Sequence, residues 1–276
     1  VPNKKKELAM GKENKSQVSK MLGVSRQLLY YHHKKPPKDW ELKTKIEEVL
    51  REHPSYGHKR LAIHLKINKK RILRVMKLFG IKPYRKRGKK FRYIKANRDC
   101  EFPNLLLTNF PFRPNQIWAS DFTHVAFQGK WIYLSTIIDL YSREIVGFSV
   151  LTNHSNQLII NALFFATNNH PAPEILHSDH GSEYASADYS TICQRLGIRQ
   201  SMSQPGCPWE NGYQESFYSQ FKIDLGDPDR FNSLGELVYA IYKTIHSYNH
   251  SRIHTKLKMP PVLYSRQYQL AHGECV

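Results

Sequence analysis

Residues 117–150 read IWASDFTHVAFQGKWIYLSTIIDLYSREIVGFSV, and the architecture of the chain follows from this stretch. It contains three runs rich in β-branched and aromatic residues: Ile117–Val125, Trp131–Leu140 and Glu144–Val150. The turn residues Gln128-Gly129 separate the first two runs, and Tyr141-Ser-Arg143 separates the last two. Runs of this kind joined by short polar turns predict an antiparallel meander of three strands.

Helical and strand patterns alternate after the meander. We expect a helix over Gln157–Thr167, a strand over Ile175–Ser178, a helix over about Ala185–Leu196, a strand over Arg199–Met202, and helices over residues 211–224 and Leu234–Tyr248. Three antiparallel strands followed by alternating helices and strands is the order of the ribonuclease H-like fold. The sequence therefore predicts an α/β core with this fold.

The basic charge of the chain is concentrated in its first third. Residues 1–100 contain 30 Lys and Arg against 8 Asp and Glu, a net charge of +22. Residues 101–276 contain 12 against 15, a net charge of −3. A basic module attached to a nearly neutral body indicates that the module binds a polyanion. The four cysteines lack zinc-ligand spacing and suggest reduced thiols of a cytosolic protein, and no apolar run is long enough to span a membrane.

A helix-turn-helix pattern covers Ser16–Tyr30. A short helix is expected to end at Leu22-Gly23, and Ser25 can cap the next helix. Arg26 and Gln27 then stand at the N-terminal end of that helix, where the motif contacts base edges in the major groove. The alternative is a plain helical hairpin. We expect Pro36-Pro37 to break the chain before a helix near Trp40–Glu52.

A second unit of similar design follows. One helix is expected over Tyr56–Leu65, and Asn68 caps another that ends at Gly80. In this second helix Leu73, Met76 and Phe79 are predicted to point inward, with Lys70, Arg71, Arg74 and Lys77 on the outer side. The expected DNA-contacting residues of this unit are Asn68, Lys69, Lys70 and Arg71.

The next segment is densely basic with interleaved aromatic residues, and it contains Arg85, Lys86 and Arg87. This segment lies between the predicted DNA-binding units and a larger body. Its position favours contact with a DNA phosphate backbone over the alternative, in which the charged side chains are simply solvated. We therefore divide the chain into a basic arm with the first helix-turn-helix (1–38), a second helix-turn-helix-like unit (39–83), a basic linker (84–111), and the ribonuclease H-like core with a C-terminal helical tail (112–276).

Three carboxylates are the candidate active site. Asp121 lies in the middle of the first strand, Asp179 lies at the carboxyl end of the fourth, and Glu215 lies on the first turns of a helix behind a Pro/Gly loop. In the predicted fold these positions are neighbours, and the glutamate could swing onto a metal ion and off again. Two divalent cations about 3.5–4 Å apart would relieve the repulsion among the carboxylates and could cleave a phosphodiester. Oxygen ligands suit Mg²⁺, or Mn²⁺, and not zinc.

Other acids and histidines have less specific interpretations. Asp139 and Glu144 suit a turn or a surface ion pair, Glu183 suits a helix N-terminus, and Asp224 suits a helix end. His177 and His180 could contact DNA or a water, or could be structural.

Several blocks together resemble the OrfB-type transposases of bacterial insertion sequences, within the DDE transposase and retroviral-integrase superfamily. The resemblance covers residues 55–265, and 35 residues separate Asp179 from Glu215 (215 − 179 − 1), as in the acidic triad of that family. The blocks are Trp118-Ala-Ser-Asp-Phe-Thr123, Ile137-Ile-Asp-Leu-Tyr-Ser-Arg143, His177-Ser-Asp-His-Gly-Ser182, Pro208-Trp-Glu-Asn-Gly-Tyr-Gln-Glu-Ser-Phe217 and Tyr248-Asn-His-Ser-Arg-Ile-His254.

The resemblance implies that Asp121, Asp179 and Glu215 bind two Mg²⁺ ions and that Lys222 faces DNA. It implies cleavage at the ends of an insertion sequence followed by 3′-OH strand transfer. The expected partners are the terminal inverted repeats, target DNA and at least one further copy of the chain, in the bacterial cytoplasm at the nucleoid. Asp224 departs from the family, which usually has Glu there. The alternatives are a non-catalytic DNA-binding regulator of transposition and a general ribonuclease H-like nuclease.

Overall fold

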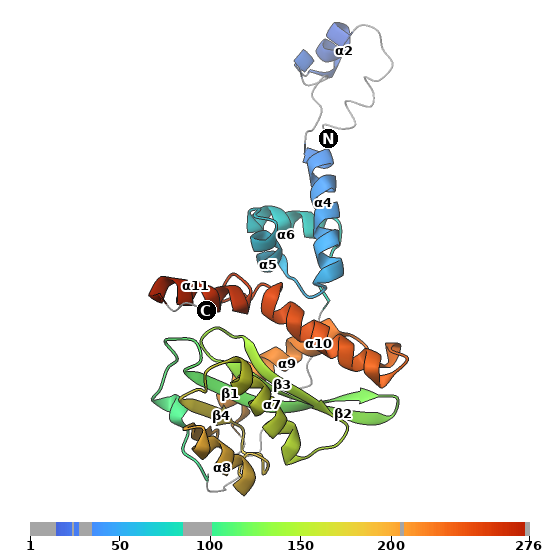
Figure 1. The fold of residues 1–276 in the computed structure, drawn as a ribbon. Coiled ribbons are helices and arrows are strands. Elements are labelled where there is room, and N and C mark those ends of the chain that lie inside the picture. Colours follow the sequence, from blue (N-terminus) through green and yellow to red (C-terminus); the bar gives the residue numbers. More distant parts are fainter. Residues whose placement is uncertain (1–14, 24, 28–34, 85–100, 205–206, 274–276) are drawn as a thin grey trace.

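The computed structural model describes residues 15–23, 25–27, 35–84, 101–204 and 207–273. Figure 1 shows an α/β body with a helical unit above it. The body contains a five-stranded sheet in the order β3-β2-β1-β4-β5. Strands β1 (Ile117–Phe127), β2 (Lys130–Asp139) and β3 (Ile145–Leu151) are antiparallel, whereas β4 (Ile175–Ser178) runs parallel to β1 and β5 (Arg199–Met202) parallel to β4. This arrangement confirms the predicted fold class.

Two tight turns shape the meander. Gln128 and Gly129 both have positive φ, 48° and 75°, as a two-residue hairpin turn that follows the strand twist requires. Between β2 and β3, the buried carboxylate of Asp139 accepts hydrogen bonds from Ser142 N at 2.8 Å and Ser142 Oγ at 2.6 Å. Asp139 is therefore a turn residue, one of the two roles expected for it.

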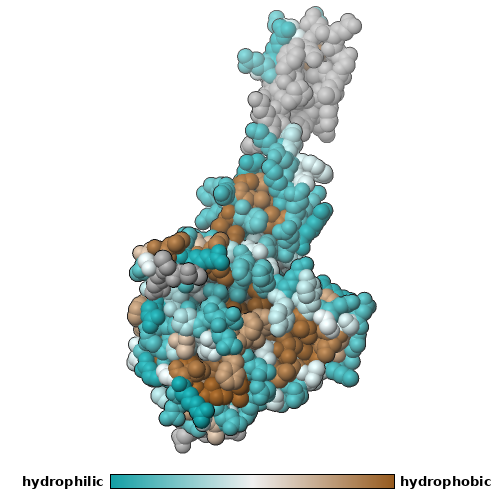
Figure 2. Space-filling model, viewed as in Figure 1, coloured by the Kyte–Doolittle hydropathy of each residue, from teal (hydrophilic) through white to brown (hydrophobic). Residues whose placement is uncertain are grey.

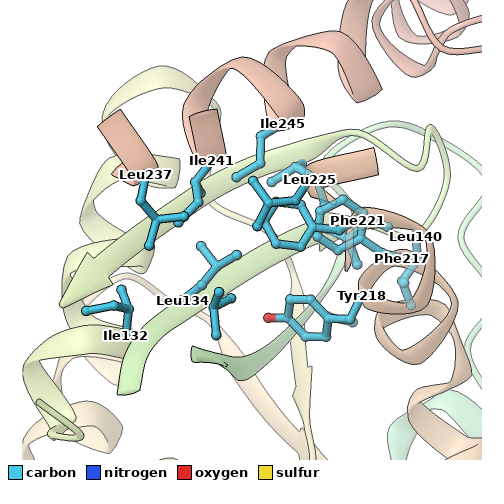
Figure 3. Close-up of a cluster of buried hydrophobic side chains, with 14 of the residues drawn as sticks. Ile132, Leu134, Leu140, Phe217, Tyr218, Phe221, Leu225, Leu237, Ile241 and Ile245 are labelled. Atoms are coloured by element: carbon cyan, nitrogen blue, oxygen red, sulfur yellow. The ribbon is translucent and has the colours of Figure 1, made fainter. Parts of the chain in front are cut away.

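Helices cover both faces of the sheet. Alternate residues of β1 point to opposite faces: Trp118 packs with helices α7 (Asn156–Asn169) and α8 (Ala187–Arg195), and Ile117 packs with helices α9 (Gly212–Leu225) and α10 (Leu234–His250). Figure 3 shows the second cluster, in which side chains of α9 and α10 meet those of β2. A Cβ atom at Gly147 of β3 would collide with the Ala162 carbonyl, so α7 lies directly on this strand.

The helical unit consists of α4 (Lys35–Glu52), α5 (His58–His64) and α6 (Lys69–Leu78), which share a core. Pro36 and Pro37 lie in the first turn of α4, so the expected break at these residues is wrong; a first-turn proline loses no helical hydrogen bond. The prediction of which α6 residues point inward is also partly wrong. Leu73 is 37 % exposed and Phe79 half-buried, whereas Ile72, Val75 and Met76 are buried.

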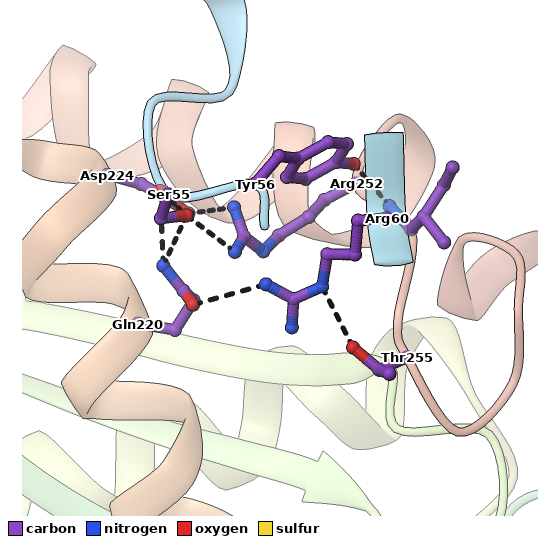
Figure 4. A network of polar contacts seen from close by, with 8 residues as sticks. Ser55, Tyr56, Arg60, Gln220, Asp224, Arg252 and Thr255 are labelled. Atoms are coloured by element: carbon purple, nitrogen blue, oxygen red, sulfur yellow. Dashed lines mark hydrogen bonds and ion pairs between the residues drawn. The ribbon is translucent and has the colours of Figure 1, made fainter. Parts of the chain in front are cut away.

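The helical unit is joined to the body by the loop after α10. Ile253 of this loop belongs to the core of the helical unit, and its N–H donates to Tyr56 Oη at 2.7 Å. A polar network lies beside it (Figure 4): Arg252 binds Asp224 of α9 at 2.6 Å and Ser55 at 2.9 Å. The two parts of the chain therefore form a continuous packed structure.

Further segments complete the fold. Helix α2 (Lys15–Leu22) lies near the N-terminus, and α11 (Pro261–His272) lies near the C-terminus, where a helical tail is expected from the sequence without stated bounds. Residues 101–111, including the short 3₁₀ helix η1 (Leu105–Leu107), pack on the sheet; Leu105 N donates to Ser201 Oγ at 2.9 Å. Two more 3₁₀ helices, η2 (Pro208–Asn211) and η3 (Pro228–Arg230), flank α9. None of the described helices has the length and apolar character that a membrane span requires.

Candidate active site

Two of the three candidate carboxylates lie at the same level of adjacent strands. Strands β1 and β4 are parallel, and Ala119 pairs with His177. Asp121 and Asp179 each lie two residues beyond this pair, and Asp179 directly follows the end of β4. Adjacent strands are about 4.8 Å apart. The register of this parallel pair therefore brings the two carboxylates together.

Helix α9 is fixed to β1 by polar side chains of a single face. Gln214 Nε2 donates to the Ala119 carbonyl at 2.6 Å and to the Thr136 carbonyl at 3.0 Å. One turn later, Tyr218 Oη donates to the Asp121 carbonyl at 2.6 Å. Asn211, at the start of the helix, donates to the Ser120 carbonyl at 3.3 Å. These hydrogen bonds set the position of α9, and with it the backbone of Glu215, against the strand that carries Asp121.

The sequence interpretation missed Asn211, Gln214 and Tyr218. Their spacing of three and four residues places them on one helix face, which was the available signal. Gln214 is completely buried and Tyr218 almost so. Polar side chains in such positions need partners, and the main-chain carbonyls of β1 and β2 supply them.

The electrostatics of the site follow from burial and crowding. Burial raises the pKa of Asp121 to about 8, with a further contribution from the charge of Asp179 and a smaller one from Glu215. Burial also raises the pKa of Asp179, and the hydrogen bond from Gly181 N opposes this change. Glu215 is exposed, and its pKa is raised only by partial burial. A negative charge at Asp121 is therefore costly without a compensating cation.

Lys222 supplies positive charge to the same region. It lies on α9 seven residues after Glu215, and its ammonium lowers the pKa of Asp121. Within the described ranges, no three His, Cys, Asp or Glu side chains are arranged to hold a metal ion. The structure therefore brings Asp121 and Asp179 together and places Glu215 within electrostatic reach, without a closed three-ligand cage.

Two residues near Asp179, His177 and Glu183, make contacts within the fold. His177 is fully buried, its Nδ1 lies 2.9 Å from Ser201 Oγ, and burial lowers its pKa to about 4. The expectation that Glu183 opens a helix is wrong, because α8 begins at Ala187. Glu183 instead lies 3.0 Å from His154 Nε2, close to Phe122 of β1.

Apart from Lys222, the expected DNA-contacting residues lie in the N-terminal third of the sequence. Ser25, Arg26 and Gln27 are exposed, and Arg26 and Gln27 are helical. The side chain of Asn68 caps α6 by accepting from Lys70 N at 2.9 Å, as predicted. Lys69, Lys70 and Arg71 are exposed on the first turn of α6, and Arg85, Lys86 and Arg87 lie outside the described residues.

Known proteins share both the sequence and the fold of this chain. Two models described as the integrase core domain match residues 111–208 and 196–261. The chain is 33 % identical over 258 residues to InsK of insertion sequence element IS150 from Escherichia coli (strain K12), covering 88 % of this chain and 90 % of InsK. It is 34 % identical over 229 residues to the transposase for insertion sequence element IS904 from Lactococcus lactis subsp. lactis (strain IL1403), covering 78 % and 89 %.

One solved structure extends the similarity to the three-dimensional level. A chain of the simian T-cell lymphotropic virus intasome, solved in complex with the PP2A regulatory subunit B56 gamma, aligns with a TM-score of 0.51 and 20 % identity. The alignment covers 76 % of this chain and 70 % of the viral one. This similarity shows a shared fold.

Proposed function

This chain belongs to the insertion-sequence transposases of the DDE and integrase superfamily, and from that premise we propose that it cuts DNA at element ends and joins the freed 3′-OH to target DNA with Mg²⁺. The observation that carries the proposal is that Asp121 of β1 and Asp179, directly after β4, lie at the same level of these paired strands, beside an α9 fixed by Gln214 and Tyr218. The helical unit, with exposed cations on α6, would bind the terminal repeats.

The donor chemistry of the site fits a hard divalent cation. Asp121, Asp179 and Glu215 offer carboxylate oxygens, which Mg²⁺ and Mn²⁺ prefer. The raised pKa of Asp121 indicates that a cation would stabilise its ionised form. Glu215 is exposed, so its side chain can rotate toward the aspartates while the hydrogen bonds of Gln214 hold the helix. Two metal ions bound there would supply activation of the attacking oxygen and charge neutralisation at the leaving oxygen.

The protein's own residues then position the DNA. The ammonium of Lys222 can hold a phosphate next to the carboxylates, because its charge already reaches Asp121. Phosphoryl transfer needs an in-line arrangement of attacking and leaving oxygens more than it needs a protein nucleophile. We therefore assign no serine or tyrosine a covalent role.

A homo-oligomer is part of the same proposal. On the face shown in Figure 2, hydrophobic residues gather in patches over the body. Phe164 and Phe165 of α7 are 46 % and 42 % exposed. Exposed apolar side chains of this kind suit a contact between two copies.

A strand-transfer assay on element-end DNA tests the proposal. Asp121→Asn, Asp179→Asn and Glu215→Gln should each abolish cleavage and joining while end binding persists. Glu174→Gln is a matched control, because Glu174 is an exposed carboxylate at the opposite end of β4. Metal-independent cleavage, or full activity in any triad variant, would exclude the mechanism. Binding by the wild type without any cleavage would instead favour the regulator.

A further inference from the structure

A cavity of about 170 Å³ lies on the side of α9 that faces away from the candidate active site. Tyr213, Ser216 and Gln220 line it, at spacings of three and four residues along the helix. Glu215 and Lys222 fall on the opposite helix face. The other walls come from the β2–β3 turn, from α5 and from the loop after α10, so four separate segments meet there.

The lining of this cavity is strongly cationic. Arg60 comes from α5, Arg143 from the β2–β3 turn, and Arg252 and Lys256 from the loop after α10. No carboxylate occurs among the described residues that line it. Arg252 is balanced by Asp224, at 2.6 Å. The remaining three cations leave a local excess of positive charge, which an anion would compensate.

Arg143 is the least balanced of these cations. The residue is only 6 % exposed, and its Nη1 is buried with no hydrogen-bond partner in the part of the chain that the structure describes. Its guanidinium lies over the ring of Tyr213, 4.0 Å from the centroid. A buried charge without a counter-charge is strongly unfavourable, and stacking on one ring offsets little of that cost. The position of Arg143 is therefore best explained by a ligand that carries negative charge.

The neighbouring groups are also held in place for such a ligand. Arg60 Nε donates to Thr255 Oγ1 at 2.9 Å, so the guanidinium is oriented before any ligand binds (Figure 4). Burial and the charge of Arg252 lower the pKa of Arg60. Burial, with the charge of Arg143 next, lowers the pKa of His254 to about 4, so its imidazole is neutral at pH 7. The cavity thus presents oriented N–H donors and crowded cations.

We propose that this cavity binds a phosphate group between Arg60, Arg143, Arg252 and Lys256. Guanidinium groups match phosphate oxygens with paired hydrogen bonds, and a tetrahedral anion can accept from several directions at once. The phosphate has two possible sources, a DNA backbone phosphodiester or free phosphate. The DNA source rests on the proposed function, whereas the free-phosphate source does not. In either case the bound anion joins Arg60 of the helical unit to Arg143 of the β2–β3 turn.

The first test measures binding of inorganic phosphate to the full chain. Phosphate should raise the melting temperature saturably relative to chloride at equal ionic strength. Arg143→Gln and Lys256→Gln should each weaken this binding about tenfold or more. Arg113→Gln should leave it unchanged, because Arg113 is half-exposed and pairs with Glu174 outside the cavity. Lys256 is exposed, so its variant remains informative if Arg143→Gln does not fold.

The second test separates the two sources. DNA affinity is measured across salt concentrations for the wild type and both glutamine variants. A DNA phosphodiester in the cavity predicts a salt slope lower by about one in each variant and competition between inorganic phosphate and DNA. Phosphate-dependent stabilisation with unchanged DNA affinity assigns the site to free phosphate. The proposal is overturned if the wild type shows no phosphate-specific stabilisation and the variants keep the wild-type salt slope. Cleavage by the wild type in the same preparation shows whether the proposed function holds independently.

Discussion

Asp121 of β1 and Asp179, the first residue after β4, each lie two residues beyond the Ala119–His177 pair of these adjacent parallel strands. Their proximity follows from the register of β1 and β4 together with the start of the loop after β4, where Gly181 N donates to Asp179 Oδ1. It also makes the site electrostatically unfavourable in the absence of a cation, because burial and mutual repulsion raise the pKa of Asp121 to about 8.

The first prediction concerns the stability of the metal-free protein. The folded-state pKa of Asp121 lies above its unfolded value, so its contribution to stability is present below about pH 4 and is lost as the pH rises through 8. Asp121→Asn removes the ionisable group, so the variant does not lose this stability as the pH rises. In EDTA the variant should match the wild type near pH 4 and exceed it at pH 9 by roughly 2 kcal/mol or more. Urea unfolding at both pH values measures the difference; equal stabilities at pH 9 would contradict the assignment.

The second prediction concerns the attachment of α9. Gln214→Leu leaves the carbonyls of Ala119 and Thr136 without their side-chain partner, which should cost about 2–4 kcal/mol of unfolding free energy. Tyr218→Phe removes the hydrogen bond to the Asp121 carbonyl and the one that Tyr218 Oη accepts from Thr136 Oγ1, and should cost roughly 1–3 kcal/mol.

If these contacts position Glu215, Tyr218→Phe should lower the cleavage rate at saturating Mg²⁺ without changing DNA affinity. Gln194→Ala, on the exposed surface of α8, serves as the control. An unchanged cleavage rate in Tyr218→Phe would mean that the hydroxyl of Tyr218 contributes to stability and not to the positioning of Glu215.

The third prediction concerns Lys222. If its ammonium contacts a DNA phosphate, Lys222→Ala should weaken binding to all sequences and lower the salt slope by about one. Lys222→Arg should keep most of the affinity, because the charge remains. The alternative is that Lys222 pairs with Glu215 and restrains it. An unchanged salt slope with a lower Mg²⁺ requirement for cleavage would support that alternative.

The fourth prediction concerns the ion pair between Arg252 and Asp224, which lies where α9 contacts the helical unit. Asp224→Asn leaves the buried guanidinium of Arg252 without its counter-charge, which should cost about 2–4 kcal/mol of unfolding free energy. Asp224→Glu should recover part of this loss, because a carboxylate remains. Glu41→Gln breaks the exposed pair with Lys45 and should change stability little. If Glu41→Gln lowered the unfolding free energy as much as Asp224→Asn does, the Arg252–Asp224 ion pair would have no special role in stability.

The sequence predicted the body well because its strands are strongly patterned. The alternating runs of β1 and β2 and the turn at Gln128-Gly129 define the meander, and the observed strand ends differ from the expected ones by at most two residues. Asp121 and Asp179 could be proposed as site residues because a charged residue within or at the end of an apolar strand is conspicuous. The fold class then predicted that these two carboxylates are neighbours.

Other features depend on contacts between distant segments, which local patterns do not encode. Leu73 satisfies a helical periodicity, yet the neighbours of α6 leave it exposed. The hydrogen bonds of Gln214 become meaningful only when β1 and β2 lie next to α9. The cavity around Arg143 needs four segments, one of which belongs to the helical unit.

The contact of Ile253 with the helical unit has a consequence for biosynthesis. The unit lies early in the chain, but its core includes a residue close to the C-terminal end, and Tyr56 bonds the N–H of that same residue. Ile253 follows the end of α6 at Leu78 by 175 residues (253 − 78), so a ribosome must synthesise the whole sheet and α10 before the helical unit gains this core contact. A chain interrupted before that point lacks this contact, so premature termination leaves the helical unit less stable as well as the α/β body unfinished.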